Sequence, residues 1–347
     1  VIKAVARGGS SAKAEEWFRK MVEASCQPNR VSYTSVMDAA AKRGDLKCAA
    51  EWYRKLRDAG FAPDKLIFVT LMNAASKARN FGAAEEWFRC MKDEDVQPNI
   101  VAYSTLINAA TREGKSGDLD AAERFFREML DSGLKPDVIV FNSLITAAAR
   151  SGDAVAAEAW FDETAGHSVD PDIISYNSLI QAHSRAGDLA RAEQRFKDLV
   201  GAVHTPYMAS VSPILTECAN RGDVDKAEYW RDAMSKRGIQ TTDFMYNQLV
   251  LCYGRATPPD IEKVELLVRD MARSQVSPTS VTVAAIKKVV GKRMAEELLS
   301  GVKIDMVPSK KSGRVLDQRR RLSFQADPNL AKWKNPDHRA DWNDIPS

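Results

Sequence analysis

Residues 30–64 read RVSYTSVMDAAAKRGDLKCAAEWYRKLRDAGFAPD, and similar text returns about every 35 residues along the chain. A proline near the end of each copy marks the period, at Pro28, Pro63, Pro98, Pro136, Pro171 and Pro206. Large aromatic residues keep step with the prolines, at Trp17, Trp52, Trp87, Phe125, Trp160 and Trp230. Such a period indicates stacked supersecondary units, so we predict a solenoid, which commonly binds an extended ligand along one face.

Each copy is expected to form two helices. In the quoted copy, residues 31–42 are predicted as the first helix and residues 46–58 as the second. Between them, Gly44 can adopt the left-handed conformation that ends a helix, and Asp45 can cap the next one. The closing proline ends the second helix, and the Asp or Asn after it can cap the following helix. The predicted fold class is all-α, a right-handed α-solenoid of helix-turn-helix repeats of about 35 residues.

Composition agrees with a helical array. The chain has 347 residues, 44% hydrophobic and 28% charged, and no apolar run is long enough to cross a membrane. A net charge of +3 excludes a strongly basic nucleic-acid coat, so any electrostatic footprint must be local. The cysteines have no close pair, which favours reduced thiols over a disulfide framework: Cys26, Cys48, Cys90, Cys218 and Cys252.

The second helices carry the packing residues. Over residues 83–91, small alanines and the aromatic residues Trp87 and Phe88 fall at helical spacing. We interpret these aromatic residues as core between helices rather than as a platform for stacking bases, because a solenoid must bury a continuous seam.

The first helices open on a fixed order of an aliphatic or aromatic residue, an aromatic residue two places on, and then a small polar residue. The examples are Val31 to Thr34, Val101 to Ser104, Ile139 to Asn142, Ile174 to Asn177 and Phe244 to Asn247. With the closing Pro-Asp or Pro-Asn, this order resembles the pentatricopeptide repeat family, whose unit begins near VTYNTLI and ends near G-x-x-P-D. The resemblance extends to about residue 300. The 34-residue tetratricopeptide repeat lacks both features and is less favoured.

The resemblance divides the chain into a truncated repeat at 1–29, seven repeats over 30–279, a degenerate or capping repeat at 280–302 and a basic, proline-containing extension at 303–347. The seven repeats are 30–64, 65–99, 100–137, 138–172, 173–207, 208–242 and 243–279. The third repeat is longer, with an expected insertion at residues 114–117, and the seventh carries Thr257-Pro258-Pro259 in the same turn. The extension could hold RNA phosphates by charge or fold back to cover the solenoid end.

The resemblance implies single-stranded RNA as the ligand, with about one base to each repeat. Two polar side chains per repeat would hydrogen-bond the base, and apolar neighbours would clamp it. The implied base-reading pairs are Thr34 with Asp64, Val69 with Asn99, Ser104 with Asp137, Asn142 with Asp172, Asn177 with Tyr207, Ser212 with Thr242, and Asn247 with Thr279. The implied base-clamping residues are Val31, Leu66, Val101, Ile139, Ile174, Ala209, Phe244 and Val281.

In the family, Thr or Ser with Asp favours G, and Asn with Asp favours U. The resemblance therefore implies G, an undefined base, G and U for the first four repeats, then a pyrimidine, a purine and a pyrimidine. Val69 cannot hydrogen-bond, Tyr207 replaces the usual Asp or Asn, and Thr241-Thr242 replaces Pro-Asp. A G-x-G-U core is the strongest expectation. Helix capping is the alternative role for the polar residues, above all for the terminal Asp.

Enzymatic motifs are not found in the sequence. A deaminase tail would need His-x-Glu and Cys-x-x-Cys to hold zinc, and neither pattern occurs. No Gly-rich phosphate loop or compact carboxylate cluster is recognisable. We therefore expect no enzyme activity, no cofactor, no metal and no small-molecule substrate.

Two function classes remain open. The first is a sequence-selective RNA-binding protein in organellar RNA processing, stabilisation or translation. Its expected partners are single-stranded RNA and other RNA-processing proteins. The second is a helical-repeat scaffold that binds a protein. Positively charged residues recur near the ends of the first helices, and this recurrence favours RNA: Lys42, Arg43, Lys77, Arg79, Arg112, Arg150 and Arg185. Family resemblance implies a mitochondrion or chloroplast, and the start at Val1 leads us to expect that a transit peptide is missing.

Overall fold

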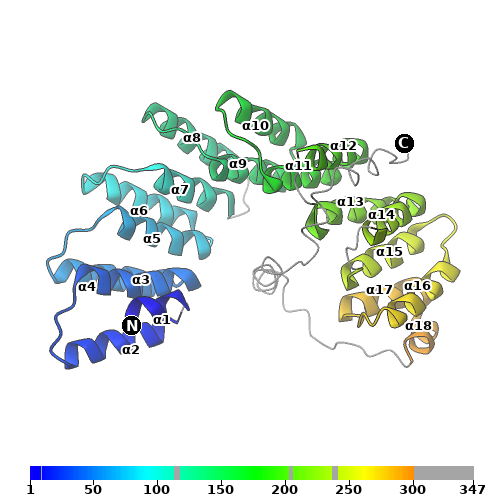
Figure 1. Ribbon diagram of the computed structural model, residues 1–347, viewed down its shortest axis with the longest axis horizontal. Coiled ribbons are helices and arrows are strands. Elements are labelled where there is room, and N and C mark those ends of the chain that lie inside the picture. Colours follow the sequence, from blue (N-terminus) through cyan, green and yellow to red (C-terminus); the bar gives the residue numbers. More distant parts are fainter. Residues whose placement is uncertain (9, 113–117, 203–205, 237–240, 301–347) are drawn as a thin grey trace. The chain divides into compact units, whose positions relative to one another are not determined.

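The computed structural model describes residues 1–8, 10–112, 118–202, 206–236 and 241–300. These residues form eighteen helices and no β-strand (Figure 1). The chain divides into two compact units, residues 1–179 and 180–347, and the border falls within α11 (Ile173–Arg185). The predicted fold class, a right-handed α-solenoid of helix-turn-helix repeats, is confirmed.

The first unit stacks consecutive helical hairpins, and its odd-numbered helices pack each against the next. Its helices before α11 are α1 (Ile2–Arg7), α2 (Ser11–Glu23), α3 (Arg30–Arg43), α4 (Leu46–Asp58), α5 (Lys65–Lys77), α6 (Phe81–Asp93), α7 (Ile100–Arg112), α8 (Asp118–Asp131), α9 (Val138–Ser151) and α10 (Ala154–Gly166).

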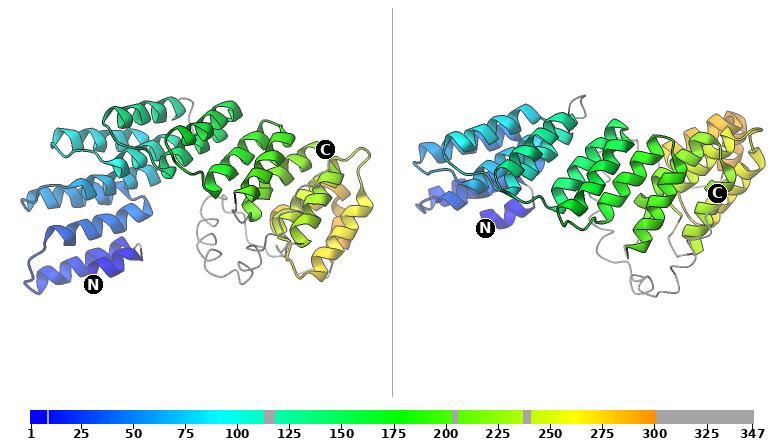
Figure 2. Two further views of the ribbon diagram at one scale, coloured as in Figure 1. Left: turned by 45° about the horizontal axis from the view of Figure 1, so that its top comes forward. Right: turned by 90° about the horizontal axis from the view of Figure 1, so that it is seen from above.

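The second unit continues the same arrangement, with α13, α15 and α17 packed in succession. Figure 2 shows the hairpins from two further directions. After α11 its helices are α12 (Leu189–Gly201), α13 (Met208–Arg221), α14 (Val224–Lys236), α15 (Asp243–Arg255), α16 (Ile261–Arg273), α17 (Ser280–Val290) and α18 (Lys292–Leu299).

The turn inside each hairpin follows from local chemistry. Gly44 has φ of +73°, the left-handed conformation that ends α3, and Asp45 caps α4 by accepting the Cys48 backbone N–H at 3.1 Å. At Gly222, where φ is +70°, an added Cβ would lie 2.7 Å from the Arg255 carbonyl oxygen. Glycine is therefore required there both by conformation and by the close approach of the next hairpin.

Aromatic side chains of successive second helices meet edge to face, as predicted for an inter-helix core. Phe18 and Trp52 have ring centroids 4.6 Å apart, and those of Phe126 and Trp160 are 5.1 Å apart. Trp230 is fully buried, whereas Trp17 is 40% exposed. The core interpretation thus fits the interior of the stack, and Trp17 departs from it.

Several predicted segments can now be placed. Thr257-Pro258-Pro259 lies between α15 and α16, and α17 with α18 occupies the predicted degenerate repeat. The expected insertion at 114–117 and the extension at 303–347 lie outside the described residues. Within the described residues, no helix is both long and apolar enough to span a bilayer.

Candidate nucleic-acid interface

The residue that closes each predicted repeat is the N-cap of the next first helix. Asp64 accepts the Ile67 backbone N–H at 3.0 Å, and Asp137 accepts the Val140 backbone N–H at 3.0 Å. Asn99 and Asp172 cap α7 and α11 in the same way. The capping role considered from the sequence is therefore real. Each cap uses Oδ1 and does not engage the second polar atom of the side chain, so capping is compatible with a base-reading role. In Asp64 that second atom, Oδ2, lies 3.4 Å from Nη1 of Arg30.

The predicted clamp residues follow these caps by two positions and are exposed. Their exposed fractions run from 38% for Phe244 to 62% for Leu66, and Ala209 is half-buried. The neighbouring third position is buried in the same helices, as at Ile67 and Val140. A row of apolar side chains therefore recurs on the surface at the repeat spacing, namely Val31, Leu66, Val101, Ile139, Ile174, Phe244 and Val281.

Hydroxyl groups at the predicted reading position donate back into their own helices. Thr34 donates to the Arg30 carbonyl at 2.8 Å, and Ser104 donates to the Ile100 carbonyl at 2.7 Å. Ser212 does the same to the Met208 carbonyl at 2.6 Å. Because the single hydroxyl hydrogen is used in these bonds, each oxygen can act towards a ligand only as an acceptor, through its two lone pairs.

The fourth repeat brings its two predicted reading residues into direct contact. Asn142 donates from Nδ2 to Oδ1 of Asp172 at 3.0 Å, and its own Oδ1 accepts from the hydroxyl of Ser175 at 2.6 Å. Asn142 is 8% exposed and Ser175 is fully buried. Sequence reasoning missed Ser175. Its signal was a small polar residue at the third helical position, where Ile67 and Val140 are apolar.

The other pairs are less complete. Val69 is buried and apolar, so it offers no hydrogen bond. Asn247 is 8% exposed, and in the part of the chain described its Oδ1 has no hydrogen-bond partner. The hydroxyl of Thr279 donates to Oδ2 of Asp243 at 2.9 Å, so its hydrogen is not available to Asn247. Asp243 is a second residue that sequence reasoning missed.

The remaining predicted readers belong to the fifth and sixth repeats. Asn177 is half-buried in the first unit, and Tyr207 is exposed in the second. Thr242 is exposed at the N-cap of α15, without a side-chain capping bond. Tyr207 and Thr242 therefore lack the carboxylate that Asp137 and Asp172 supply at the ends of the third and fourth repeats.

Cations at the ends of the first helices hold the stack together. Lys77 donates to the Lys42 carbonyl at 3.3 Å, and Arg150 donates to the Thr111 carbonyl at 3.0 Å. Lys42 donates to the Ala6 carbonyl at 3.1 Å. These bonds satisfy carbonyl groups that a helix C-terminus leaves without partners. Their recurrence therefore has a structural cause and does not by itself favour RNA.

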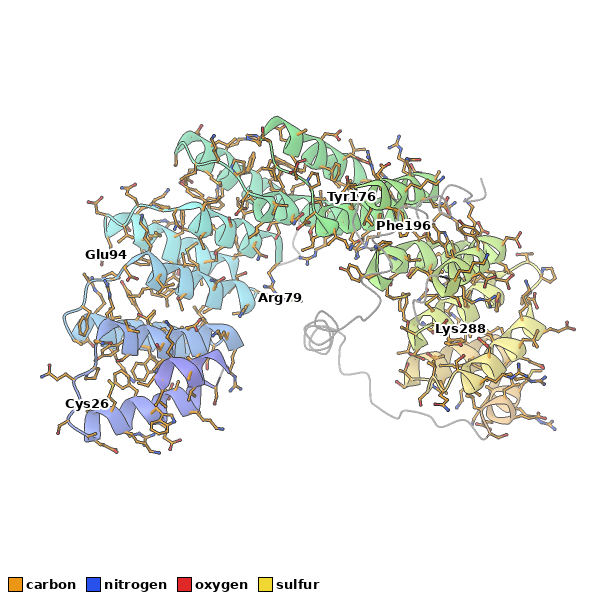
Figure 3. The ribbon with its side chains drawn as sticks, in the orientation of Figure 1. Cys26, Arg79, Glu94, Tyr176, Phe196 and Lys288 are labelled. Carbon is orange, nitrogen blue, oxygen red and sulfur yellow. The ribbon has the colours of Figure 1, made fainter. Side chains whose placement is uncertain are left out.

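Figure 3 labels residues at the two ends of the hairpins of the first unit. Cys26 and Glu94 lie where the second helices finish, and Arg79 lies at the opposite end. Across the described residues, no group of three or more His, Cys, Asp or Glu side chains is placed to hold a metal.

Comparison with protein-family models gives three matches, all of them to models of the pentatricopeptide repeat (PPR). The pentatricopeptide repeat domain model matches residues 1–43 and 124–186, and the PPR repeat family model matches residues 63–112. A PPR repeat model matches residues 31–61, 101–134 and 174–202. Taken together, these matches span more than half of the chain. Among curated proteins, none matches it.

Solved structures with the same fold include the pentatricopeptide repeat protein PPR10 in complex with an 18-nt psaJ RNA element. That structure is 23% identical, with a TM-score of 0.72, and the match covers 86% of this chain and 44% of that one. PPR10 from maize is 21% identical, with a TM-score of 0.59, covering 84% of this chain and 46% of that one. The chain spans less than half the length of either structure.

Proposed function

Because the chain belongs to the pentatricopeptide repeat family, we propose that it binds single-stranded RNA sequence-selectively, with about one base held at each repeat. The observation that carries the proposal is the exposed apolar row at the second position of the first helices. Exposed large apolar groups repeated on one helix position gain nothing for folding. Between such groups on neighbouring repeats, the flat face of a base would be buried.

The polar groups beside this row support a preference for guanine at the third repeat. Ser104 presents an oxygen lone pair, because its hydrogen is bonded to the Ile100 carbonyl, and Asp137 presents a carboxylate oxygen outside its cap. Two acceptors match guanine, whose Watson–Crick edge carries adjacent donors at N1 and N2. Adenine offers a single donor group on that edge. Thr34 and Asp64 give the first repeat the same two acceptors, although Oδ2 of Asp64 also lies 3.4 Å from the guanidinium of Arg30.

At the fourth repeat an amide and a carboxylate support recognition of a pyrimidine base. Asn142 carries both a donor and an acceptor, and Asp172 holds its nitrogen. Its carbonyl oxygen is then available to accept from uracil N3–H beside the Ser175 bond, since a carbonyl oxygen has two lone pairs. The proposed recognition core is therefore G-x-G-U, and all four of its repeats lie within the first compact unit.

Family membership also supports the setting of this function. We propose that the protein acts in a mitochondrion or chloroplast, in RNA processing, stabilisation or translation. It would work by occupying its RNA site, without a catalytic step and without a cofactor, and with other RNA-processing proteins as partners. Localisation of a fluorescent fusion of the complete gene product tests the compartment, and a cytosolic signal would contradict it.

Binding by fluorescence anisotropy tests the function itself. The probes are a single-stranded RNA containing GAGU, the same sequence as single-stranded DNA, and a scrambled RNA, each at two salt concentrations. We expect tightest binding to the GAGU RNA, and we expect Ser104→Ala to weaken that preference. Absence of RNA binding at low salt would contradict the proposal and favour the alternative, a helical-repeat scaffold for a protein partner.

A further inference from the structure

The amide of Asn142 is held at both ends, by Asp172 at the close of its own repeat and by Ser175 in the following repeat. Its Nδ2 donates to Asp172 at 3.0 Å, and its Oδ1 accepts from the Ser175 hydroxyl at 2.6 Å. Ser175 is fully buried, and Asn142 is 8% exposed. A side chain held at two points in a buried setting has little freedom to turn about its last torsion angle.

The chemistry of the partners fixes which way the amide faces. The Asp172 carboxylate only accepts hydrogen bonds, so the nitrogen of Asn142, not its oxygen, must face it. The Ser175 hydroxyl lies 2.6 Å from Asn142 Oδ1 but 3.3 Å from Asp172 Oδ1, so its one hydrogen serves Asn142. The hydroxyl oxygen of Ser175 in turn accepts from the Asp172 backbone N–H at 3.1 Å. Asp172 therefore sets the direction of the amide, and Ser175 holds its far end.

Uracil and cytosine differ in the order of donors and acceptors that this amide would meet. Uracil has a donor at N3 beside an acceptor at C4, whereas cytosine has an acceptor at N3 beside a donor at C4. An amide that can turn round satisfies either base, and one that cannot turn satisfies only one. We propose that Ser175 is a positioning residue: Asp172 sets which way the Asn142 amide faces, and Ser175 holds the amide oxygen in the place where it would meet uracil N3–H, which strengthens the preference of the fourth repeat for uracil over cytosine. This inference rests on the proposed function.

The seventh repeat supplies a natural comparison. Thr282 occupies the position in α17 that Ser175 occupies in α11, and it is also fully buried. Its hydroxyl, however, donates to Asp243, and so does the hydroxyl of Thr279. Asn247 Oδ1 has no hydrogen-bond partner among the described residues. The oxygen of Asn247 thus lacks the attachment that Ser175 gives to Asn142, and we expect the seventh repeat to separate uracil from cytosine less well than the fourth.

The test compares affinities for RNAs that carry GAGU or GAGC. The wild-type protein is expected to prefer GAGU. Ser175→Ala is expected to reduce the ratio of the two affinities about fivefold, the effect of one lost hydrogen bond. Ser175→Thr, which keeps the hydroxyl at a position where Thr282 is accommodated, is expected to restore the ratio.

Two controls separate positioning from folding. Ser32→Ala removes the equivalent hydroxyl from α3, where it bonds to the cap Asn29 and contacts Met21, and is expected to leave the ratio unchanged. The preference for G over A at the third base provides a second control within each variant, because a loss of folded protein lowers all affinities together. Ser104 and Asp137 remain in place in Ser175→Ala, so that preference persists.

The outcomes distinguish the two proposals. If wild-type protein binds GAGU RNA selectively and Ser175→Ala keeps the full uracil preference, the role of Ser175 is wrong and the proposed function stands. If wild-type protein fails to bind the RNA, both are wrong. A uracil preference that falls in Ser175→Ala and returns in Ser175→Thr, with the third-base preference intact, supports the positioning role.

Discussion

Arg150, in the last turn of α9, donates from Nη1 to the backbone carbonyl of Thr111 at the end of α7, at 3.0 Å. Arg255 forms the equivalent bond to the Ala219 carbonyl in the second unit, also at 3.0 Å. These two cations therefore join α9 to α7 and α15 to α13 by satisfying a terminal carbonyl group.

Arg150→Ala is expected to lower the free energy of unfolding by about 1 kcal/mol, because one hydrogen bond and a favourable helix-end charge are lost. The dependence of RNA affinity on salt should stay the same. Urea unfolding and a salt titration of RNA binding measure the two effects. Arg89→Ala, at an exposed position of α6, is the matched control. A smaller salt dependence with unchanged stability would assign Arg150 to phosphate binding.

Ile139→Ala is expected to weaken RNA binding by about 1 kcal/mol, because its side chain would cover one face of a base. The free energy of unfolding should change by less than about 0.5 kcal/mol, since Ile139 is 57% exposed. Val155→Ala, at an exposed position of α10, is the control and should alter neither quantity. Equal affinities for Ile139→Ala and the wild type would remove Ile139 from the clamp.

Asp172→Asn is expected to shift the fourth repeat from uracil towards cytosine. An amide at position 172 can donate to Oδ1 of Asn142, so the Asn142 amide can turn round. In the turned amide, Nδ2 of Asn142 can donate a hydrogen bond to the Ser175 hydroxyl oxygen. The cap of α11 should persist because Asn caps a helix about as well as Asp. Competition between GAGU and GAGC RNAs measures the shift. An unchanged uracil preference would argue against amide reading at this repeat.

Burial raises the pKa of the Cys218 thiol to about 12 and that of Cys252 to about 12, from an ordinary value of 9.0. Below pH 9 these thiols are neutral in both the folded and the unfolded state. As pH rises from 9 towards 12, the unfolded thiols ionise first, so their contribution to stability is lost. Urea unfolding at pH 8 and pH 11 should show the loss. Combined Cys218→Ala and Cys252→Ala should reduce this pH-dependent difference, and an unchanged difference would assign it to other groups.

The repeat architecture was predictable from sequence because its signals are local. Gly44 ends a helix and Asp45 caps the next one through contacts within a few residues, so the printed text carries both effects. Helix α4 has the predicted bounds, and α3 extends one residue beyond the prediction at each end. The positions of the clamp residues also follow from the caps, but their role in binding stays a prediction.

The lateral contacts between repeats could not be predicted in the same way. Ser175 meets Asn142 across 33 positions, and Thr282 occupies an equivalent position yet bonds to Asp243. Which partner a hydroxyl takes depends on side-chain geometry between hairpins, and a periodic sequence does not encode this visibly. The structural role of the recurring cations is not visible in the sequence for the same reason, since the carbonyl partner of Arg150 belongs to the preceding repeat.

The central claim is that first-helix residues read bases in a fixed order. The most direct measurement compares the affinity of the wild-type protein for GAGU RNA with that for RNAs changed at one base at a time. We predict losses of about 1–3 kcal/mol on changing either G or the U, and little change at the second base, where Val69 cannot hydrogen-bond. Equal affinities for GAGU RNA and for all of the changed RNAs would contradict base reading by these repeats.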